Sequence, residues 1–264
     1  MAEDILLKSK AGDIAAYLAM PKGTPKGGVV VIQEIFGVNH HIRAVTDKFA
    51  TDGYIALAPR FFDHIKKNIE LGYTPDTIAE GRNYVMTPGF TDKAVQDVEA
   101  AIAELKKRGA QKVAVTGYCW GGSTSFLFAT RRPSLKAAFV FYGSAPSNNA
   151  QGQPYAVDKD AVGKIGAPVY GFYAENDMRI DATVPPTTDA MKELKKAYDP
   201  VTYTGAGHGF MRAGEPNSPE PKPAAADADE AAQKKAASDL AMYKANRKAR
   251  DDAWTRWKAI LAKL

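Results

Sequence analysis

The segment Gly117-Tyr118-Cys119-Trp120-Gly121 places a cysteine between two closely spaced glycines. A short apolar run rich in β-branched residues, 112–116, stands before it, and residues 122–130 have the composition of a helix. This order predicts a strand, a sharp turn and a helix, with the residue at the turn held in a strained backbone conformation. The flanking glycines leave room where a β-carbon would collide with a neighbouring element. Such an elbow presents a nucleophile, here the only cysteine of the chain.

The helix that follows the elbow favours this chemistry at Cys119. Its N-terminus directs free N–H groups and the positive end of the helix dipole at the sulfur, which favours the thiolate. The N–H of Trp120 is then available to an oxyanion. The alternative is a buried structural cysteine, which is a common fate of a free thiol.

Two further predicted strands end in groups that complete a catalytic set. The apolar run 169–173 leads into a loop that contains Asp177, and the run 201–204 leads into a loop that contains His208. Catalytic groups of an open parallel sheet gather at the carboxyl ends of its strands. In the chain order Cys119, Asp177, His208, a neutral His208 would take a proton from the thiol or from water, and Asp177 would orient it. Each residue also has an alternative role when it is considered alone. Asp177 could be a solvated loop carboxylate, and His208 could be a hydrogen-bonded turn residue.

Together with a third motif, these residues resemble a known family. Gln33-Glu34-Ile35-Phe36-Gly37 follows the apolar strand 28–32, and with the cysteine elbow and the segment 207–210 it is similar to the dienelactone hydrolase (carboxymethylenebutenolidase) family of α/β-hydrolases. The resemblance runs from Ile14 to Arg212. It implies a triad of Cys119, Asp177 and His208, and an oxyanion hole formed by the N–H groups of Ile35 and Trp120.

The resemblance also implies a role for Glu34 in controlling the nucleophile. In the resting enzyme Glu34 would meet the thiol, and it would accept the thiol proton when substrate binds. A carboxylate beside a thiol disfavours the thiolate and so protects an exposed nucleophile from oxidation. The alternative for Glu34 is an acid that caps the helix starting near His40.

The substrate-binding residues are also inferred from the resemblance. Arg212 is expected to bind a substrate carboxylate, a task suited to a planar guanidinium. Arg82 is the candidate for a second such arginine, with an ordinary surface arginine as the alternative. Phe36, Trp120 and Tyr142 are expected to line the pocket, and core packing is their alternative role.

Composition excludes several other classes of protein. The chain has 264 residues, 45% of them hydrophobic and 25% charged, which is ordinary for a soluble globular protein. It has no apolar run of membrane-spanning length and no secretory signal, so we expect a cytoplasmic protein or one exported from a longer precursor. One cysteine rules out an internal disulfide framework.

Charge and motif spacing argue against nucleic acid, metal and nucleotide ligands. The net charge of +5 is spread along the chain, so no nucleic-acid partner is expected. The four histidines lack metal-ligand spacing, and no phosphate-binding glycine motif is present. We therefore expect no metal and no cofactor, and a monomer or a homodimer.

Alternation of predicted strands and helices indicates an α/β fold, with a mostly parallel sheet covered by helices on both faces. We expect one α/β-hydrolase domain: a catalytic core over 1–216, a proline-rich linker over 217–223 and a helical extension over 224–264. Residues 5–7 and 14–18 predict an opening hairpin, and the turn-rich stretch 60–88 could carry a flap over the site. In the extension, six apolar residues recur at three- and four-residue steps: Leu240, Tyr243, Trp254, Trp257, Leu261 and Leu264. This stripe predicts a long helix that covers the core, with a partner surface as the alternative.

The combined prediction is a cofactor-independent hydrolase that cleaves lactone or ester bonds. Its substrate would be a small ester or lactone, which could also bear a carboxylate. The reaction would pass through an acyl-enzyme on Cys119. A carboxylesterase of broader specificity is the alternative within this class. A redox-thiol protein and a non-catalytic binding protein on the same fold are further alternatives, and the absence of a second cysteine weighs against the redox protein.

Overall fold

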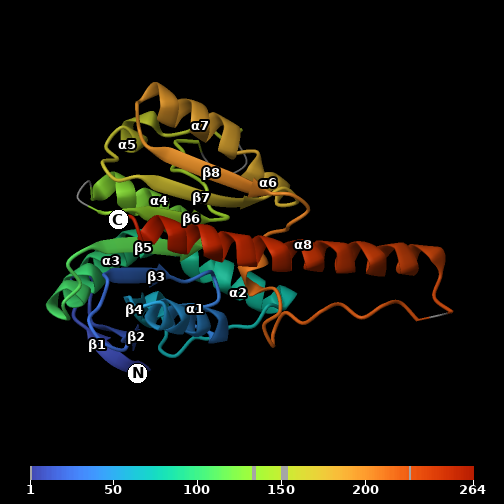
Figure 1. The fold of residues 1–264 in the computed structure, drawn as a ribbon, viewed down its shortest axis with the longest axis horizontal. Coiled ribbons are helices and arrows are strands. Elements are labelled where there is room, and N and C mark those ends of the chain that lie inside the picture. Colours follow the sequence, from blue (N-terminus) through green and yellow to red (C-terminus); the bar gives the residue numbers. More distant parts are fainter. Residues whose placement is uncertain (1, 133–134, 150–153, 226) are drawn as a thin grey trace.

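An eight-stranded sheet forms the centre of the computed structural model, which describes residues 2–132, 135–149, 154–225 and 227–264 (Figure 1). The strands are β1 (Ala2–Leu7), β2 (Ile14–Ala19), β3 (Gly28–Ile32), β4 (Ile55–Pro59), β5 (Val113–Tyr118), β6 (Ala138–Phe141), β7 (Val169–Ala174) and β8 (Tyr198–Tyr203). The α-helices are α1 (His40–Thr51), α2 (Pro75–Val85), α3 (Phe90–Lys107), α4 (Trp120–Arg131), α5 (Lys159–Val162), α6 (Met178–Asp181), α7 (Val184–Glu193) and α8 (Glu230–Leu261). Two short 3₁₀ helices are η1 (Phe61–His64) and η2 (Phe210–Arg212).

The sheet has the order β1-β2-β4-β3-β5-β6-β7-β8. The first two strands pair antiparallel, and β2 also runs antiparallel to β4. All pairs from β4 through β8 are parallel, so their carboxyl ends lie along one edge. The predicted α/β class, the parallel sheet and the opening hairpin are confirmed. The expected triad residues each follow one of these parallel strands.

Apolar residues on both faces of the sheet account for its two helical layers. Along β3, Val30 and Ile32 belong to a core cluster that includes α3 and α4, whereas Val29 and Val31 belong to a second cluster that includes α1 and α8. Alternate side chains of a strand point to opposite faces, so a continuous apolar run needs cover on both. This explains why the central strands are apolar at nearly every position.

The second half of α8 completes one of these layers. Trp257 is fully buried, 4.1 Å from the ring of Phe49 and 5.5 Å from that of Phe139. Trp254 stacks on Phe49 at 4.9 Å. The predicted long helix and its core-covering role are thus confirmed for this half, although the helix begins at Glu230 rather than near residue 224.

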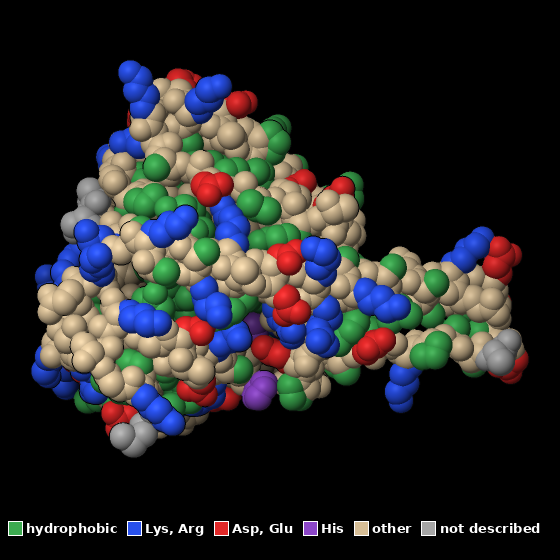
Figure 2. Space-filling model, viewed as in Figure 1, with side chains coloured by type: hydrophobic (Ala, Val, Ile, Leu, Met, Phe, Trp, Pro, Cys, Tyr) green, Lys and Arg blue, Asp and Glu red, His purple; other side chains and the backbone are tan. Residues whose placement is uncertain are grey.

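The first half of α8 extends beyond the α/β body, with the segment after η2 running beside it (Figure 1). Most residues between 230 and 244 are exposed. Lysine, arginine and acidic side chains are interspersed over this part and over the visible face of the body (Figure 2). No single basic stripe is present on that face.

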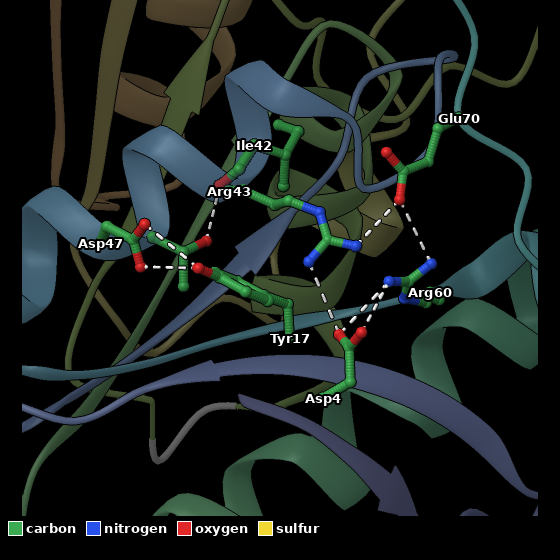
Figure 3. A network of polar contacts seen from close by, with 8 residues as sticks. Asp4, Tyr17, Ile42, Arg43, Asp47, Arg60 and Glu70 are labelled. Atoms are coloured by element: carbon green, nitrogen blue, oxygen red, sulfur yellow. Dashed lines mark hydrogen bonds and ion pairs between the residues drawn. The ribbon is translucent and has the colours of Figure 1, made fainter. Parts of the chain in front are cut away.

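A network of charged side chains anchors the loop 65–74 to the rest of the fold (Figure 3). Arg60 lies 3.0 Å from Asp4 and 3.4 Å from Glu70, and Arg43 donates to Glu70 at 2.8 Å. These contacts tie β1, α1 and the loop 65–74 together. Glu70 also forms an isolated antiparallel bridge with Gly37. The region 60–88, expected to be rich in turns, therefore contains an anchored loop followed by a regular helix, α2.

Candidate active site

The elbow between β5 and α4 has the strained geometry that its sequence predicts. Cys119 has φ 57° and ψ −117°, in a region that residues with a β-carbon rarely occupy. A β-carbon at Gly117 would lie 1.9 Å from the carbonyl oxygen of Gly121. One at Gly121 would lie 2.3 Å from that of Gln33. The glycines therefore allow the elbow to pack directly against the chain that leaves β3.

The structure brings Cys119, His208 and Asp177 together at the carboxyl edge of the sheet. The Nδ1–H of His208 donates to Oδ2 of Asp177 at 2.5 Å, and Cys119 lies close enough to the ring to raise its pKa. Asp177 is buried at the N-terminus of α6, whereas His208 precedes η2. The ring of Tyr142 packs edge-on against His208 with centroids 5.0 Å apart. These contacts fix the imidazole from two sides.

The environment of His208 favours its charged form. Burial alone lowers the pKa of this imidazole, but the hydrogen bonds and charges of Asp177 and Cys119 outweigh burial and raise the pKa to about 10. The ring therefore carries a second proton at neutral pH. The carboxylate of Asp177 stabilises the imidazolium through its charge and its hydrogen bond.

Two residues that line the same pocket as Cys119 have backbone N–H groups with no acceptor in the described part of the chain. Ile35 lies in the turn after β3, and Trp120 is the first residue of α4. Neither N–H donates a hydrogen bond to any residue that the structure describes. Free N–H groups at a helix N-terminus attract negative charge.

Glu34 and Arg212 form a buried ion pair within the site. Nη1 of Arg212 donates to Oε1 of Glu34 at 2.6 Å, and the two side chains are 17% and 1% exposed. Burial alone would raise the pKa of Glu34, but Arg212 and His41 outweigh burial and hold it below its ordinary value. The resemblance implies that Glu34 meets the resting thiol, whereas here its bonded partner is Arg212. The alternative that Glu34 caps α1 is excluded, because the N-cap residue of α1 is Asn39 and its first turn contains no acid.

A cavity of about 480 Å³ opens over these groups. Phe36, Trp120, Tyr142 and Arg212 line it, as expected from the sequence. Arg82, the less certain candidate, also lines it from α2, although its side chain is exposed. All of the predicted site residues except the fully buried Glu34 therefore line one pocket. Glu34 lies behind this lining and accepts a hydrogen bond from Arg212.

Several residues at the site have no sequence signal that singles them out. The guanidinium of Arg212 lies over the ring of Tyr73 at 4.5 Å and over that of Phe36 at 5.7 Å, so the two rings hold it in place. Tyr73 comes from the anchored loop 65–74, far from Arg212 in sequence. Five more residues line the cavity: Ile78, Ser123, Ser144, Arg179 and Ile180. Tyr73 lies in a turn-rich loop and Arg179 lies two residues after an acid. Both patterns are too common for either residue to be identified as a site residue from one sequence.

No cluster of three or more histidine, cysteine, aspartate or glutamate side chains suited to a metal ion occurs among the described residues. His64 pairs instead with Asp97, at 2.7 Å between Nε2 and Oδ2. None of the helices that the structure describes is long and apolar enough to cross a membrane.

Comparison with known proteins gives one consistent result. The model of the dienelactone hydrolase family matches residues 14–264. A candidate carboxymethylenebutenolidase of Synechocystis is 36% identical over 205 residues, which cover 75% of this chain and 81% of that protein. One of Methylorubrum extorquens is 32% identical over 215 residues, covering 80% and 72%. The crystal structure of a candidate dienelactone hydrolase of Klebsiella pneumoniae, 24% identical, superposes over 100% of this chain and 99% of its own with a TM-score of 0.74.

Proposed function

The chain belongs to the dienelactone hydrolase family and is a hydrolase of ester or lactone bonds, and from this premise we propose that Cys119 is its nucleophile. In the proposed reaction the sulfur of Cys119 attacks the substrate carbonyl, and His208 then gives its proton to the departing alkoxide. This forms a thioester between Cys119 and the acyl group. Water, deprotonated by His208, then attacks the thioester and releases the carboxylic acid and the free thiol.

Asp177 acts on this cycle through His208. Its carboxylate accepts the Nδ1–H, so the other ring nitrogen always faces the sulfur. It also stabilises the imidazolium in each step that protonates the ring. The raised pKa of His208 supports an imidazolium that is ready to give its proton to the departing alkoxide.

The N–H groups of Ile35 and Trp120 are proposed to bind the oxygen of the tetrahedral intermediate. Both are free in the described structure, and both residues line the pocket of Cys119. Donors held in advance stabilise developing charge with little reorganisation, and the loss of one costs about 10²–10³-fold in rate. The close packing of Gly121 on the chain after β3 keeps the two donors adjacent.

Arg212 is proposed to bind a carboxylate on the substrate, with Arg82 as a second cation at the mouth and Phe36, Trp120 and Tyr142 as walls. In the structure Arg212 is neutralised by Glu34, so a substrate carboxylate must take the place of Glu34 on the guanidinium. Glu34 is then free to accept the proton of a protonated thiol. This exchange would link activation of Cys119 to the binding of an anionic substrate.

The observation that supports the nucleophile most strongly is that three features meet at one pocket: the strained φ of Cys119, the His208 ring bonded to Asp177, and the free N–H groups of Ile35 and Trp120. The test is hydrolysis of a short nitrophenyl ester and of a carboxylate-bearing lactone by the wild type and by Cys119→Ala. We expect kcat/KM to fall by about 10⁴-fold or more for both, with an unchanged circular dichroism spectrum. Retention of a tenth of the activity would exclude Cys119.

A further inference from the structure

A second cavity, of about 420 Å³, adjoins the active-site pocket. Trp120, Ser123 and Ser144 line both cavities, so the two meet next to the elbow. The residues of α4 that line the second cavity share one face of the helix, being three, four and seven residues beyond the first: Trp120, Ser123, Thr124 and Leu127. The helix rises about 10 Å along this face, so the cavity is a groove that leads away from the nucleophile. We call it the α4 groove.

The other walls of the α4 groove come from two more parts of the fold. Thr91 of α3 lies on one side, and the segment 144–147 after β6, with Tyr155, lies on the other. At the inner end the ring of Trp120 packs against that of Phe90, with centroids 5.4 Å apart. The junction between the two cavities is therefore formed by a packed side chain.

The α4 groove differs in charge from the active-site pocket. Three arginines line the pocket: Arg82, Arg179 and Arg212. None of the described residues that line the groove carries a charge. An ionic group that enters the groove would lose water without gaining a charged partner, so the groove favours an uncharged ligand.

Most hydroxyl groups of the groove already have partners within the protein. Thr124 donates to the backbone of its own helix at 2.9 Å, and Tyr155 donates to the carbonyl oxygen of Ala145 at 3.2 Å. The hydroxyl oxygen of Ser123 accepts from the N–H of Ser144 at 2.9 Å. A ligand therefore needs few polar groups to satisfy these walls. The apolar and aromatic side chains that it would contact are Trp120, Leu127, Ala145, Pro146 and Tyr155.

The proposed reaction decides which part of an ester reaches this groove. The departing alkoxide must face His208, which lines the active-site pocket but not the groove. The acyl group stays on the sulfur of Cys119, the residue directly before α4. The acyl chain is therefore the part of the substrate that can extend from the sulfur along this helix.

We propose that the α4 groove is the acyl-chain subsite of the enzyme. It takes an uncharged, apolar chain attached to the carbonyl carbon, whereas the arginine-lined pocket takes an anionic part of the substrate. The substrate class is then an ester or lactone whose acyl side carries an apolar chain of up to about 10 Å, the length of the groove. The inference rests on the proposed function, because Cys119 must hold the acyl group.

Nitrophenyl esters of acetate, butanoate and hexanoate test the subsite, because they differ only in the acyl chain. Burial of one methylene group is worth up to about fourfold in affinity, so kcat/KM of the wild type should rise by about two- to fourfold per methylene from acetate to hexanoate. The absence of such a rise would overturn the inference.

Two substitutions fill the groove from opposite walls. Leu127→Trp fills it from α4 and Thr91→Phe fills it from α3, so the test does not depend on the folding of one variant. In each, the gain from acetate to hexanoate should shrink to less than about twofold in total. Leu6→Trp is the matched control, since Leu6 lies on β1 and is 61% exposed, and it should keep the full gain. A full gain in either groove variant, with an unchanged circular dichroism spectrum, would contradict the proposal.

Binding of methyl ketones tests the groove without catalysis, because a ketone has no ester bond to cleave. Calorimetry of the wild type should give 2-octanone at least about tenfold higher affinity than 2-butanone, and Leu127→Trp should bring the two within about twofold. Equal affinities in the wild type would refute the inference even if every ester is hydrolysed. If no ester is hydrolysed, the proposed function fails, and the ketones still decide whether the groove binds an apolar chain.

Discussion

Replacing Arg212 by methionine tests whether the active site depends on a buried ion pair. The substitution keeps the length and apolar stem of the side chain but removes the partner of Glu34, whose carboxylate is 1% exposed. Removal of one member of a buried pair costs about 3–5 kcal/mol, since a charge is left uncompensated. We expect about 3 kcal/mol at neutral pH, because Arg212 itself is 17% exposed and His41 remains beside Glu34.

The loss in the free energy of unfolding depends on pH because the carboxylate of Glu34 titrates. In the wild type the pKa of Glu34 is held below its ordinary value of 4.5, so the pair stabilises the fold above about pH 4.5 and this contribution is lost as the pH falls through the lowered pKa. Without Arg212, burial is less opposed and Glu34 can protonate instead. The difference in stability between the two proteins should therefore be larger at pH 7 than at pH 4.

Urea unfolding followed by tryptophan fluorescence measures this difference. The double variant Arg212→Met, Glu34→Gln should recover most of the loss, because it leaves no buried charge. Lys234→Met is the matched control: it breaks an exposed pair, with side chains 76% and 82% exposed, and should cost less than about 1 kcal/mol. A loss below about 1 kcal/mol for Arg212→Met at pH 7, or an equal loss at both pH values, would refute the reasoning.

Three further predictions concern the elbow, the core and metal dependence. Gly121→Ala places a β-carbon 2.3 Å from the carbonyl oxygen of Gln33 and 2.4 Å from that of Ile32. The substitution should therefore displace the turn that contains Ile35 and lower kcat/KM by about 10²-fold or more. Wild-type activity would show that the elbow tolerates the added carbon. Trp257→Ala should lower the free energy of unfolding by about 3–5 kcal/mol, measured by urea unfolding, because the side chain is fully buried; a loss under about 1 kcal/mol would contradict its place in the core. Activity should survive EDTA and dialysis, since the proposed groups supply nucleophile, acid and base, and recovery only after added zinc would oppose this.

The parts of the fold predicted most closely from the sequence are those with strong local signals. The strand before the elbow, the positive φ of Cys119 and the three strand ends that carry the candidate triad follow from apolar runs and glycine spacing. The indole rings of α8 follow from a stripe at helical spacing. Such features are set by short stretches of chain, so one sequence suffices to recognise them.

The parts that could not be predicted depend on contacts between distant segments. Tyr73 contacts Arg212 from a loop that is held by distant residues, with Glu70 paired to Arg60 (Figure 3) and the Tyr73 hydroxyl bonded to Asn39. The partner of Glu34 is 178 residues away along the chain, and Glu215, the partner of His41, is 174 residues away from it. The raised pKa of His208 likewise depends on Asp177 and Cys119, which follow two other strands. Pairings of this kind leave no periodic pattern in the sequence.

Rapid-quench mass spectrometry of the enzyme during hydrolysis of a nitrophenyl ester tests the central claim most directly. The chain has one cysteine, so a thioester can form at a single position. We expect an acyl adduct on the peptide that contains Cys119, formed before steady state and lost when the ester is exhausted, with no adduct and no turnover in Cys119→Ala. Turnover by Cys119→Ala, or an acyl group found on Ser123 instead, would contradict it.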